Sequence, residues 1–281
     1  TKPSLIAGFG GYPSYPSLSA ARSMGLPIII HEQNSVLGRV NRLFAKTAKY
    51  VACGFDRLDR LPLAAEDRKK VVGNPVRNPI KAVRDRPYPE LSDTGPLNIL
   101  VTGGSQGARL FGEVIPQAIA SLPEAQRARL TVVQQAREEQ LEAVRGAYRA
   151  AGVKHTVESF FSDMQDKLAA AHLVIARSGA GTVTELAVAG RPAILIPLGI
   201  AMDDHQTANA EGMVTGAAAD VVPEPKFTAE MLAPLLLERI SNAGVLRARA
   251  KASWQLGKPN AARELADLAE QAAGVTGKRD A

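Results

Sequence analysis

The residues from Ala176 to Ala187 have the types and spacing of a site that binds an anionic nucleotide. An apolar run over 173–176 predicts a buried strand; small residues and glycines then form a tight turn, and we predict that a helix begins at Thr182. A helix N-terminus presents free N–H groups and partial positive charge, which suit an anionic ligand. Glu185, one turn into this helix, has a carboxylate that can accept hydrogen bonds from two vicinal hydroxyls, as on a ribose.

A second interpretation of the same residues is purely structural. Thr182 and Glu185 have the spacing of a capping box, in which the glutamate bonds back to the backbone of the threonine. A carboxylate has about four acceptor sites, so Glu185 can serve both purposes. Both interpretations therefore stay open.

A second glycine turn has the same order of strand, turn and helix. Gly103 and Gly104 follow an apolar run at 98–102, and the hydroxyl and backbone N–H of Ser105 can meet a phosphate at the start of the next helix. The spacing matches neither the P-loop nor the G-x-G-x-x-G pattern. The structural alternative is a turn that packs the helix close to its strand. A third glycine turn, at 8–14, allows the same two interpretations.

Four consecutive polar residues, His31, Glu32, Gln33 and Asn34, follow the strand expected over 27–31. Ligands of open α/β sheets bind at the carboxyl ends of strands, so these side chains can hydrogen-bond a sugar. The alternative is an ordinary solvated loop in which Asn34 caps the next helix.

Another polar group, Asp203, Asp204, His205 and Gln206, precedes the helix expected over 206–214. Two carboxylates and an imidazole are metal-ligand types, but no other ligand cluster supports a metal, so we expect none. The acidic pair also suits the first turn of a helix through the macrodipole. Gln206, a neutral donor and acceptor, is a candidate for binding sugar hydroxyls.

The composition limits the class of protein and of partner. With 281 residues, 46% hydrophobic and 22% charged, the chain is globular and long enough for two domains. It has no apolar run of about 18 residues, the length that predicts a membrane span, and it enters its first strand at once, so we expect no signal peptide and a chain that starts inside a domain. A lone Cys53 excludes an internal disulfide.

The net charge of +6 suits an anionic partner. Nucleic acid is disfavoured, because aromatic residues are only 5% and no stacking motif is present. The basic helical stretch at 39–49 can lie on an anionic membrane surface or simply face solvent.

Apolar strands alternate with amphipathic stretches along the chain, which predicts parallel sheets covered by helices. We expect strands at 4–8, 27–31, 50–53, 98–102, 130–134, 173–176, 193–197 and 220–222, and helices at 16–24, 36–46, 107–121, 136–151 and 206–214. Prolines and charges near 74–97 predict a boundary or surface loop. The expected domains are 1–76, 77–255 and a final helical segment, 256–281.

Taken in order, six motifs resemble glycosyltransferase family 28, in particular its peripheral enzymes of bacterial peptidoglycan synthesis. The motifs are GFGGYPS (8–14), HEQN (31–34), GNPVR (73–77), GGSQGAR (103–109), RSGA (177–180) followed by Glu185, and DDHQ (203–206) followed by Asn209 and Ala210. The resemblance covers nearly the whole chain.

This resemblance implies the GT-B fold, with two Rossmann-like domains around a cleft and the first of them incomplete here. It implies an inverting transferase without a metal or other cofactor. The donor would be UDP-N-acetylglucosamine, and the acceptor the C4 hydroxyl of undecaprenyl-diphosphate-linked N-acetylmuramoyl-pentapeptide. The enzyme would act at the cytoplasmic face of the bacterial cell membrane, as a peripheral protein on its anionic surface.

The resemblance also assigns donor-binding roles. Glu185 would hold the ribose hydroxyls, Phe161 would lie at the uracil through its backbone, and Arg77 would contact the donor. Asn34 and Gln206 would touch the sugar. The diphosphate would meet Ser105 and the start of the helix, namely Ala180, Gly181, Thr182, Val183 and Thr184.

One motif of the family, a Gly-Gly-Thr-Gly-Gly-His turn with the candidate general base, is absent from this sequence, so the catalytic base stays unassigned. Two alternatives remain open. The chain is a UDP-sugar binding module, or it is another GT-B enzyme, such as a UDP-N-acetylglucosamine 2-epimerase.

Overall fold

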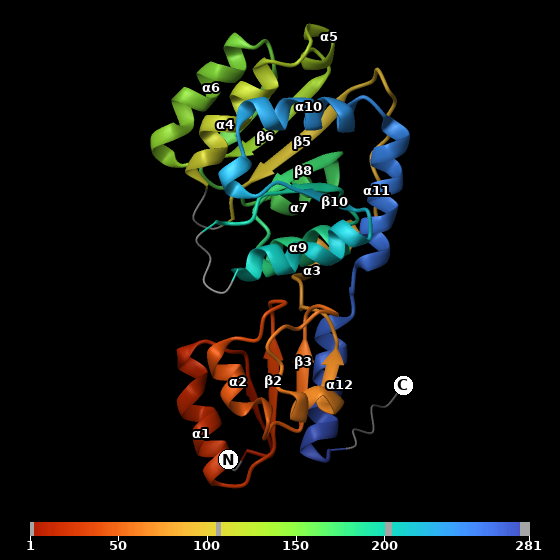
Figure 1. The fold of residues 1–281 in the computed structure, drawn as a ribbon. Helices are drawn as coiled ribbons and strands as arrows, with labels where there is room; N and C mark the ends of the chain where they lie inside the picture. Colours follow the sequence, from red (N-terminus) through yellow and green to blue (C-terminus); the bar gives the residue numbers. More distant parts are fainter. Residues whose placement is uncertain (1–2, 105–107, 200–203, 276–281) are drawn as a thin grey trace.

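The computed structural model describes residues 3–104, 108–199 and 204–275. Within these residues the chain forms two α/β units, one on a four-stranded and one on a six-stranded sheet (Figure 1). Every strand pair in both sheets is parallel. The predicted class, α/β with two parallel sheets, is confirmed.

The first unit packs helices on both faces of its sheet. Its strands, in spatial order, are β1 (Ile6–Gly8), β2 (Ile28–Glu32), β3 (Tyr50–Cys53) and β4 (Lys69–Val71). Its helices are α1 (Tyr15–Ser23), α2 (Arg39–Ala45) and, from the far end of the chain, α12 (Ala261–Ala273). Leu268 of α12 packs on Ile29, Ala52 and Val72, so the carboxy-terminal helix closes the core of the amino-terminal sheet.

The second unit is larger. Its strands, in spatial order, are β10 (Ala219–Val221), β9 (Ala193–Leu195), β8 (Leu173–Ala176), β5 (Leu97–Thr102), β6 (Leu130–Gln135) and β7 (Lys154–Glu158). Its helices include α3 (Asn78–Val83), α4 (Arg109–Ala120), α5 (Glu124–Arg127), α6 (Leu141–Ala150), α7 (Met164–Ala170), α8 (Ala180–Ala189), α9 (His205–Thr215), α10 (Ala229–Ile240) and α11 (Ala243–Leu256). Helices cover both faces of this sheet, which explains why every residue of β8 is buried and apolar.

The order of strands in the second sheet reverses between β5 and β8. From β5 the chain adds β6 and β7 on one side, then crosses over and adds β8, β9 and β10 on the other. The connections that follow β5 and β8 therefore leave toward opposite faces. In open α/β sheets such a reversal opens a crevice at the carboxyl ends of the strands, where ligands bind.

Most predicted strands and helices are found, with ends shifted by a few residues, but two edge strands are missed. β4 reads Lys-Lys-Val and β7 reads Lys-His-Thr-Val-Glu. Both are partly exposed, so neither needs the apolar run that marks a central strand. Helices α3, α5 and α7 are also missed. An extended boundary was expected where α3 lies, but the proline of α3 stands in the first turn, where a helix tolerates it.

The chain passes between the units twice, near 72–77 and near 257–260, and the two passages touch. Gly73 has a φ of +87°, and a Cβ built on it would lie 2.8 Å from the Cβ of Lys258 and 3.1 Å from that of Ala261. Only glycine fits both the left-handed backbone and this close approach. Gly73 therefore fixes how the two passages cross.

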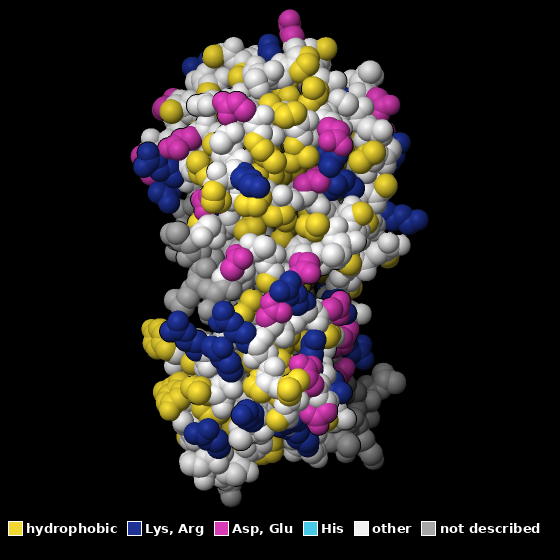
Figure 2. Space-filling view, in the orientation of Figure 1, with side chains coloured by type: hydrophobic (Ala, Val, Ile, Leu, Met, Phe, Trp, Pro, Cys, Tyr) yellow, Lys and Arg dark blue, Asp and Glu magenta, His cyan; other side chains and the backbone are white. Residues whose placement is uncertain are grey.

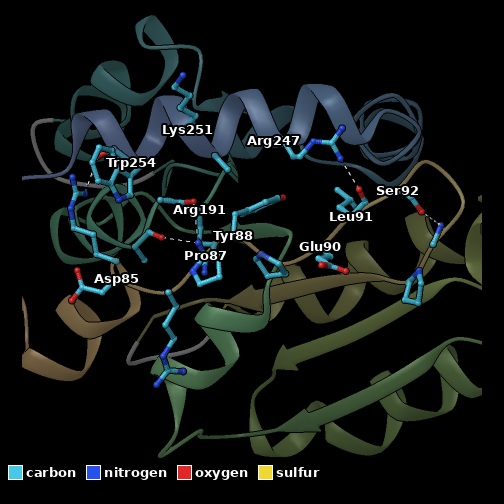
Figure 3. A pocket seen from close by; sticks show the side chains of 18 residues that line it. Asp85, Pro87, Tyr88, Glu90, Leu91, Ser92, Arg191, Arg247, Lys251 and Trp254 are labelled. Atoms are coloured by element: carbon cyan, nitrogen blue, oxygen red, sulfur yellow. Dashed lines mark hydrogen bonds between the residues drawn. The ribbon is translucent and has the colours of Figure 1, made fainter.

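The segment 84–96, which we call the strap, runs along the second unit without helix or strand. Its carbonyls accept hydrogen bonds from arginines elsewhere in this unit: Leu91 from Arg247 at 2.6 Å and Ser92 from Arg129 at 2.8 Å. Figure 3 shows the cavity between the strap and α11, about 990 Å³, with Tyr88 and Arg191 at its centre. This cavity is larger than the one at the strand reversal, which is described below. Its polar groups are engaged in holding the strap, as Arg247 shows, so we do not assign it a ligand.

We predict that Gly73→Ala destabilises the protein more than Gly152→Ala, measured by chemical denaturation. Both glycines have positive φ, +87° and +67°, but a Cβ at Gly152 would meet nothing within 4 Å. Gly152→Ala should cost about 1 kcal/mol, the left-handed penalty alone. Gly73→Ala should cost roughly 1–3 kcal/mol more, because the crossing passages must also move apart. Equal costs would show that the close approach contributes nothing.

Candidate functional site

A cavity of about 750 Å³ opens at the carboxyl ends of β5 and β8, where the strand order reverses. Its walls come from five connections that follow strands, namely β5, β6, β8, β9 and β10, and from the first turns of α4, α8 and α9. The lining residues are Gly103, Gly104, Ala108, Arg109, Leu110, Glu113, Arg137, Arg177, Gly179, Gly181, Thr182, Leu198, Gln206 and Glu224. We call it the donor cavity, because the resemblance assigns donor contacts to three of its lining residues, Gly181, Thr182 and Gln206. Its volume is in the range of small-molecule sites.

The N-terminus of α8 forms one wall of the donor cavity. The helix begins at Ala180 with Gly179 as N-cap, and its first intrahelical bond runs from Val183 N–H to Gly179 C=O at 3.0 Å. The N–H groups of Ala180, Gly181 and Thr182 precede that bond and have no partner within the helix. A Cβ at Gly179 or Gly181 would meet nothing within 4 Å, so a ligand can approach this backbone.

The predicted start of this helix is wrong, and one of the two interpretations left open for Glu185 is excluded. The helix begins at Ala180 and not at Thr182, because Gly179 already provides the extended N-cap backbone. The capping box does not form, since no side chain caps the helix and Thr182 lies inside its first turn. Glu185 is thereby free of the structural role that competed with ligand binding.

The glycine turn after β5 forms the opposite wall. Gly104 adopts a φ of +78°, and its N–H donates to Thr102 Oγ1 at 3.4 Å. Thr102 in turn donates to Gln135 Oε1 at 3.0 Å, which ties the turn to the end of β6. Ser105, a predicted phosphate contact, lies outside the described residues, between cavity-lining Gly104 and Ala108.

Arg177 and Glu224 form an ion pair within the donor cavity that the prediction of site residues missed. Arg177 Nη2 lies 2.7 Å from Glu224 Oε1, and both side chains are largely buried. Arg177 also donates to the carbonyls of Ile196 and Pro197. Glu224 Oε2 accepts from Gly199 N–H at 2.5 Å. The pair therefore holds residues 196–199, which follow β9, against the cavity.

The charge on Glu224 is stabilised by its partners. Burial alone would raise the pKa of this carboxyl, but hydrogen bonds from Gly199 and Arg177 bring the pKa below its usual value. The sequence signal that could have identified Glu224 is its position just after β10, because residues at strand ends line such crevices.

Gln206, which was predicted, lines the same cavity and accepts from Leu198 N–H through Oε1 at 3.0 Å.

Arg77 and Glu185, both predicted donor contacts, lie together at the edge of the site. Arg77 Nη2 is 3.4 Å from Glu185 Oε1, and Arg77 is far more exposed than Glu185. Burial raises the pKa of the Glu185 carboxyl, and Arg77 offsets this only in part. Neither residue lines the donor cavity itself; Glu185 lies one helical turn beyond Gly181.

Three other predicted contacts, Phe161, Val183 and Thr184, do not line the donor cavity. Phe161 is buried at 5% exposure and does not line the donor cavity, so its contact with the uracil stays a prediction. Val183 and Thr184 point away from the donor cavity and line a second cavity between the units. Thr184 Oγ1 donates to Ala180 C=O and accepts from Asn74 Nδ2.

Asn34 takes part in a hydrogen-bonded bridge between the two units. Its N–H and Nδ2 donate to buried Glu32, at 3.1 and 3.3 Å. Its Oδ1 accepts from Asn209 Nδ2 of α9 at 3.1 Å, and Asn209 Oδ1 accepts from Ser35 N–H at 2.8 Å. Asn209 Nδ2 also donates to Ser178 C=O, shortly before α8, so the bridge links the first unit to the donor cavity.

His31, in the same predicted polar run, is held by two protein contacts. Its Nε2–H donates to Gly73 C=O at 2.9 Å, and its Nδ1 accepts from Gln33 at 3.3 Å. Burial lowers the pKa of His31 despite the hydrogen bond to Gly73 and the nearby Glu32 carboxylate. With both ring nitrogens engaged in protein contacts, His31 holds the loop that follows β2.

Metal binding gains no support in the part of the chain that the structure describes, where no three His, Cys, Asp or Glu side chains are placed to hold an ion. Asp203 lies outside the described residues, and Asp204 has a left-handed backbone with φ of +50°. The absence of a metal stays a prediction.

Comparisons with known proteins agree with the motifs. Residues 98–271 match the glycosyltransferase family 28 C-terminal domain, and residues 1–53 match the glycosyltransferase family 28 N-terminal domain. Two relatives carry the name UDP-N-acetylglucosamine--N-acetylmuramyl-(pentapeptide) pyrophosphoryl-undecaprenol N-acetylglucosamine transferase. The one from Maricaulis maris (strain MCS10) is 56% identical over 94% of this chain and 72% of its own length. The one from Rhodospirillum centenum (strain ATCC 51521 / SW) is 48% identical over 98% and 72%.

Solved structures give the same result at the level of the fold. MurG of Acinetobacter baumannii superposes with a TM-score of 0.81 at 35% identity, covering 95% of this chain and 74% of that one. The UDP-GlcNAc 2-epimerase of Neisseria meningitidis bound to UDP-GlcNAc has a TM-score of 0.60 at 14% identity, covering 94% and 74%, which shows a common fold alone. This chain therefore belongs to glycosyltransferase family 28 and has its GT-B fold, two Rossmann-like domains built on parallel sheets.

Proposed function

We propose that this chain is an inverting glycosyltransferase that moves N-acetylglucosamine from UDP-N-acetylglucosamine to the C4 hydroxyl of undecaprenyl-diphosphate-linked N-acetylmuramoyl-pentapeptide. The observation that carries the proposal is the donor cavity, with a free helix N-terminus and a buried arginine at the strand reversal, in a chain whose relatives bear the name of this activity. Donor and lipid-linked acceptor are the substrates that this name implies.

The donor cavity suits the charge that develops in such a reaction. The acceptor C4 oxygen attacks the anomeric carbon from the face opposite the diphosphate, the bond from that carbon to the diphosphate oxygen breaks, and UDP leaves with the electron pair. The proton of the C4 hydroxyl passes to a base, which we leave unassigned. The N–H groups of Ala180, Gly181 and Thr182, together with Arg177, would stabilise the departing diphosphate.

Glu185 is proposed as the ribose-binding residue. Its carboxylate lies one turn from the proposed diphosphate position, and Arg77 contacts only one of its oxygens at 3.4 Å. Phe161, Asn34, Gln206 and Ser105 keep their proposed donor contacts. Asn34 would have to share its Oδ1 with Asn209, or exchange that bond for one to the sugar.

The competing functions have less support. A binding module without catalysis would share the donor cavity, and an assay with the lipid acceptor separates the two. An epimerase is supported by the fold alone, whereas the transferase name comes with 56% identity.

The first unit also offers a surface for the anionic membrane that we propose as a partner. Figure 2 shows Lys and Arg side chains beside hydrophobic ones on the unit that carries α1 and α2. Tyr15 and Leu43 are exposed at 46% and 60%, and Arg39 and Lys46 are exposed near them on α2 and at its end. Among the described helices, none is long and apolar enough to cross a membrane. We propose peripheral attachment at the cytoplasmic face through this surface, and no nucleic-acid partner.

We predict that Glu185→Gln weakens UDP-N-acetylglucosamine binding by about 1–3 kcal/mol, roughly 5- to 150-fold, because the ribose hydroxyls lose a charged acceptor. Isothermal titration calorimetry measures this. Since burial raises the pKa of Glu185, wild-type affinity should also fall in mild acid more steeply than that of the variant. The matched control is Glu142→Gln on α6, an exposed carboxylate also paired with an arginine. Unchanged affinity in folded Glu185→Gln would refute the ribose assignment.

A second prediction concerns the ion pair in the donor cavity. Glu224→Gln should leave the fold intact but lower affinity for UDP roughly 10-fold, because Arg177 and the connection at 196–199 lose their shared anchor. Arg177→Lys should weaken binding by a similar factor, since lysine cannot bond Glu224 and two carbonyls in one plane. UDP titration measures both, and wild-type affinity in either variant contradicts the proposed role.

A third prediction concerns the membrane surface. Arg39→Ser with Lys46→Ser should weaken binding to phosphatidylglycerol vesicles by about 2 kcal/mol, roughly 30-fold, because each basic side chain near an anionic surface contributes about 1 kcal/mol. Vesicle co-sedimentation measures this. Arg149→Ser with Lys154→Ser removes the same charge from the second unit and should have little effect. If both pairs weaken binding equally, net charge and not this surface holds the protein on the vesicle.

A further inference from the structure

A second cavity, of about 450 Å³, lies between the two units beside the passages of the chain. We call it the hinge pocket. Loops after β2, β3 and β4 form one wall, and α8, α9 and the end of α11 form the other. The lining residues are Ser35, Gly54, Phe55, Asp56, Arg57, Gly73, Asn74, Val183, Thr184, Ala187, Ala208, Asn209, Glu211, Gly212, Met213, Thr215, Gly216, Leu256 and Lys258.

The hinge pocket is separate from the donor cavity. The two share no lining residue, although both border α8. Gly181 and Thr182 of that helix line the donor cavity, whereas Val183, Thr184 and Ala187 line the hinge pocket. α8 therefore contributes to the walls of both cavities.

The chemistry of the hinge pocket suits a neutral ligand. Apolar side chains supply much of its surface, among them Phe55, Val183, Met213 and Leu256. The charges at its border balance: Arg57 pairs across the units with Glu211, and Asp56 and Lys258 have opposite sign. A charged molecule would gain no net attraction there.

Asn74 provides a polar anchor in the wall. It is only 5% exposed, and its Nδ2 donates to Gln33 C=O at 2.9 Å and to Thr184 Oγ1 at 3.0 Å. Its Oδ1 is buried and accepts no hydrogen bond from the described residues. This oxygen packs against Gly54, so a ligand N–H or O–H group reaches it only when the Asn74 side chain turns toward the pocket. Such a contact would satisfy an acceptor whose burial without a partner is unfavourable by about 1–3 kcal/mol.

We propose that the hinge pocket is a regulatory site for a neutral, mostly apolar molecule with one hydrogen-bond donor, and that such a molecule lowers affinity at the donor cavity. Its walls belong to different units, so its volume depends on how the units are placed. A bound molecule resists any rotation that narrows the pocket. If donor binding draws the two units together, a molecule in the hinge pocket weakens donor binding. By thermodynamic linkage, the donor then weakens binding in the hinge pocket by the same factor.

The test uses N-phenyl-1-naphthylamine, a neutral aromatic amine with one N–H whose fluorescence rises in apolar surroundings. The blocking variant is Gly212→Trp on α9, with Gly146→Trp on α6 as matched control. Both glycines lie inside helices, and a Cβ at either would meet nothing within 4 Å, so each accepts this first side-chain atom without collision. Gly212→Leu, a smaller block, serves if the tryptophan variant fails to fold as judged by circular dichroism.

We expect saturable probe binding in the wild type and in Gly146→Trp, and at least tenfold weaker binding when Gly212 carries the blocking side chain. Saturable binding that survives both blocking variants, or no saturable binding to the wild type, overturns the site. We also expect saturating probe to weaken UDP-N-acetylglucosamine binding about fivefold or more, within the usual range of coupling between sites. Unchanged or stronger donor binding overturns regulation. Titration with the donor alone tests the proposed function separately.

Discussion

The parallel direction of the strands in the second sheet is the constraint on which the site depends. All six strands end at the same edge, and the reversal between β5 and β8 sends their following connections apart. The crevice left between them receives the first turns of α4 and α8, whose leading N–H groups have no partner in their own helices. The backbone thus supplies partial positive charge to the donor cavity, beside the side chains of Arg109, Arg137 and Arg177 that line it. Arg177 is held in place by partly buried Glu224.

The second requirement is a defined relation between the two units, and polar side chains provide it. Asn209 contacts Asn34, Ser35 and Ser178, and it is fully buried, so a single amide connects the first unit with the turn before α8. Asn74 makes a parallel connection to Thr184. Hydrogen bonds of this kind are directional and individually weak in net free energy, which suits an interface that must both hold a geometry and allow it to change. Large apolar contacts would lock it.

The separation of the two cavities follows from the helix between them. Successive residues of α8 point in directions about 100° apart, so neighbours such as Thr182 and Val183 face different spaces. A displacement of this helix relative to the first unit would alter both cavities. Coupling between donor binding and the hinge pocket therefore needs no long chain of contacts. It needs only that the helix and the first unit move as nearly rigid bodies.

The sequence determined the class of fold, the family and the segments that carry the chemistry, because these depend on local patterns: apolar runs, glycine turns after strands and polar residues at strand ends. The predicted start of α8 at Thr182 was wrong, since Gly179 serves as N-cap and the helix begins at Ala180, two residues earlier. The capping box, which the sequence left open, does not form. Edge strands β4 and β7 carried no apolar run, so the sequence did not reveal them. The pairing of Arg77 with Glu185, of Arg177 with Glu224 and of Asn34 with Asn209 joins residues 47 to 175 positions apart. The tertiary structure alone decided those pairs, and with them the hinge pocket, because the distance between two side chains remote in sequence depends on how the sheets and helices pack and on no local property of either residue.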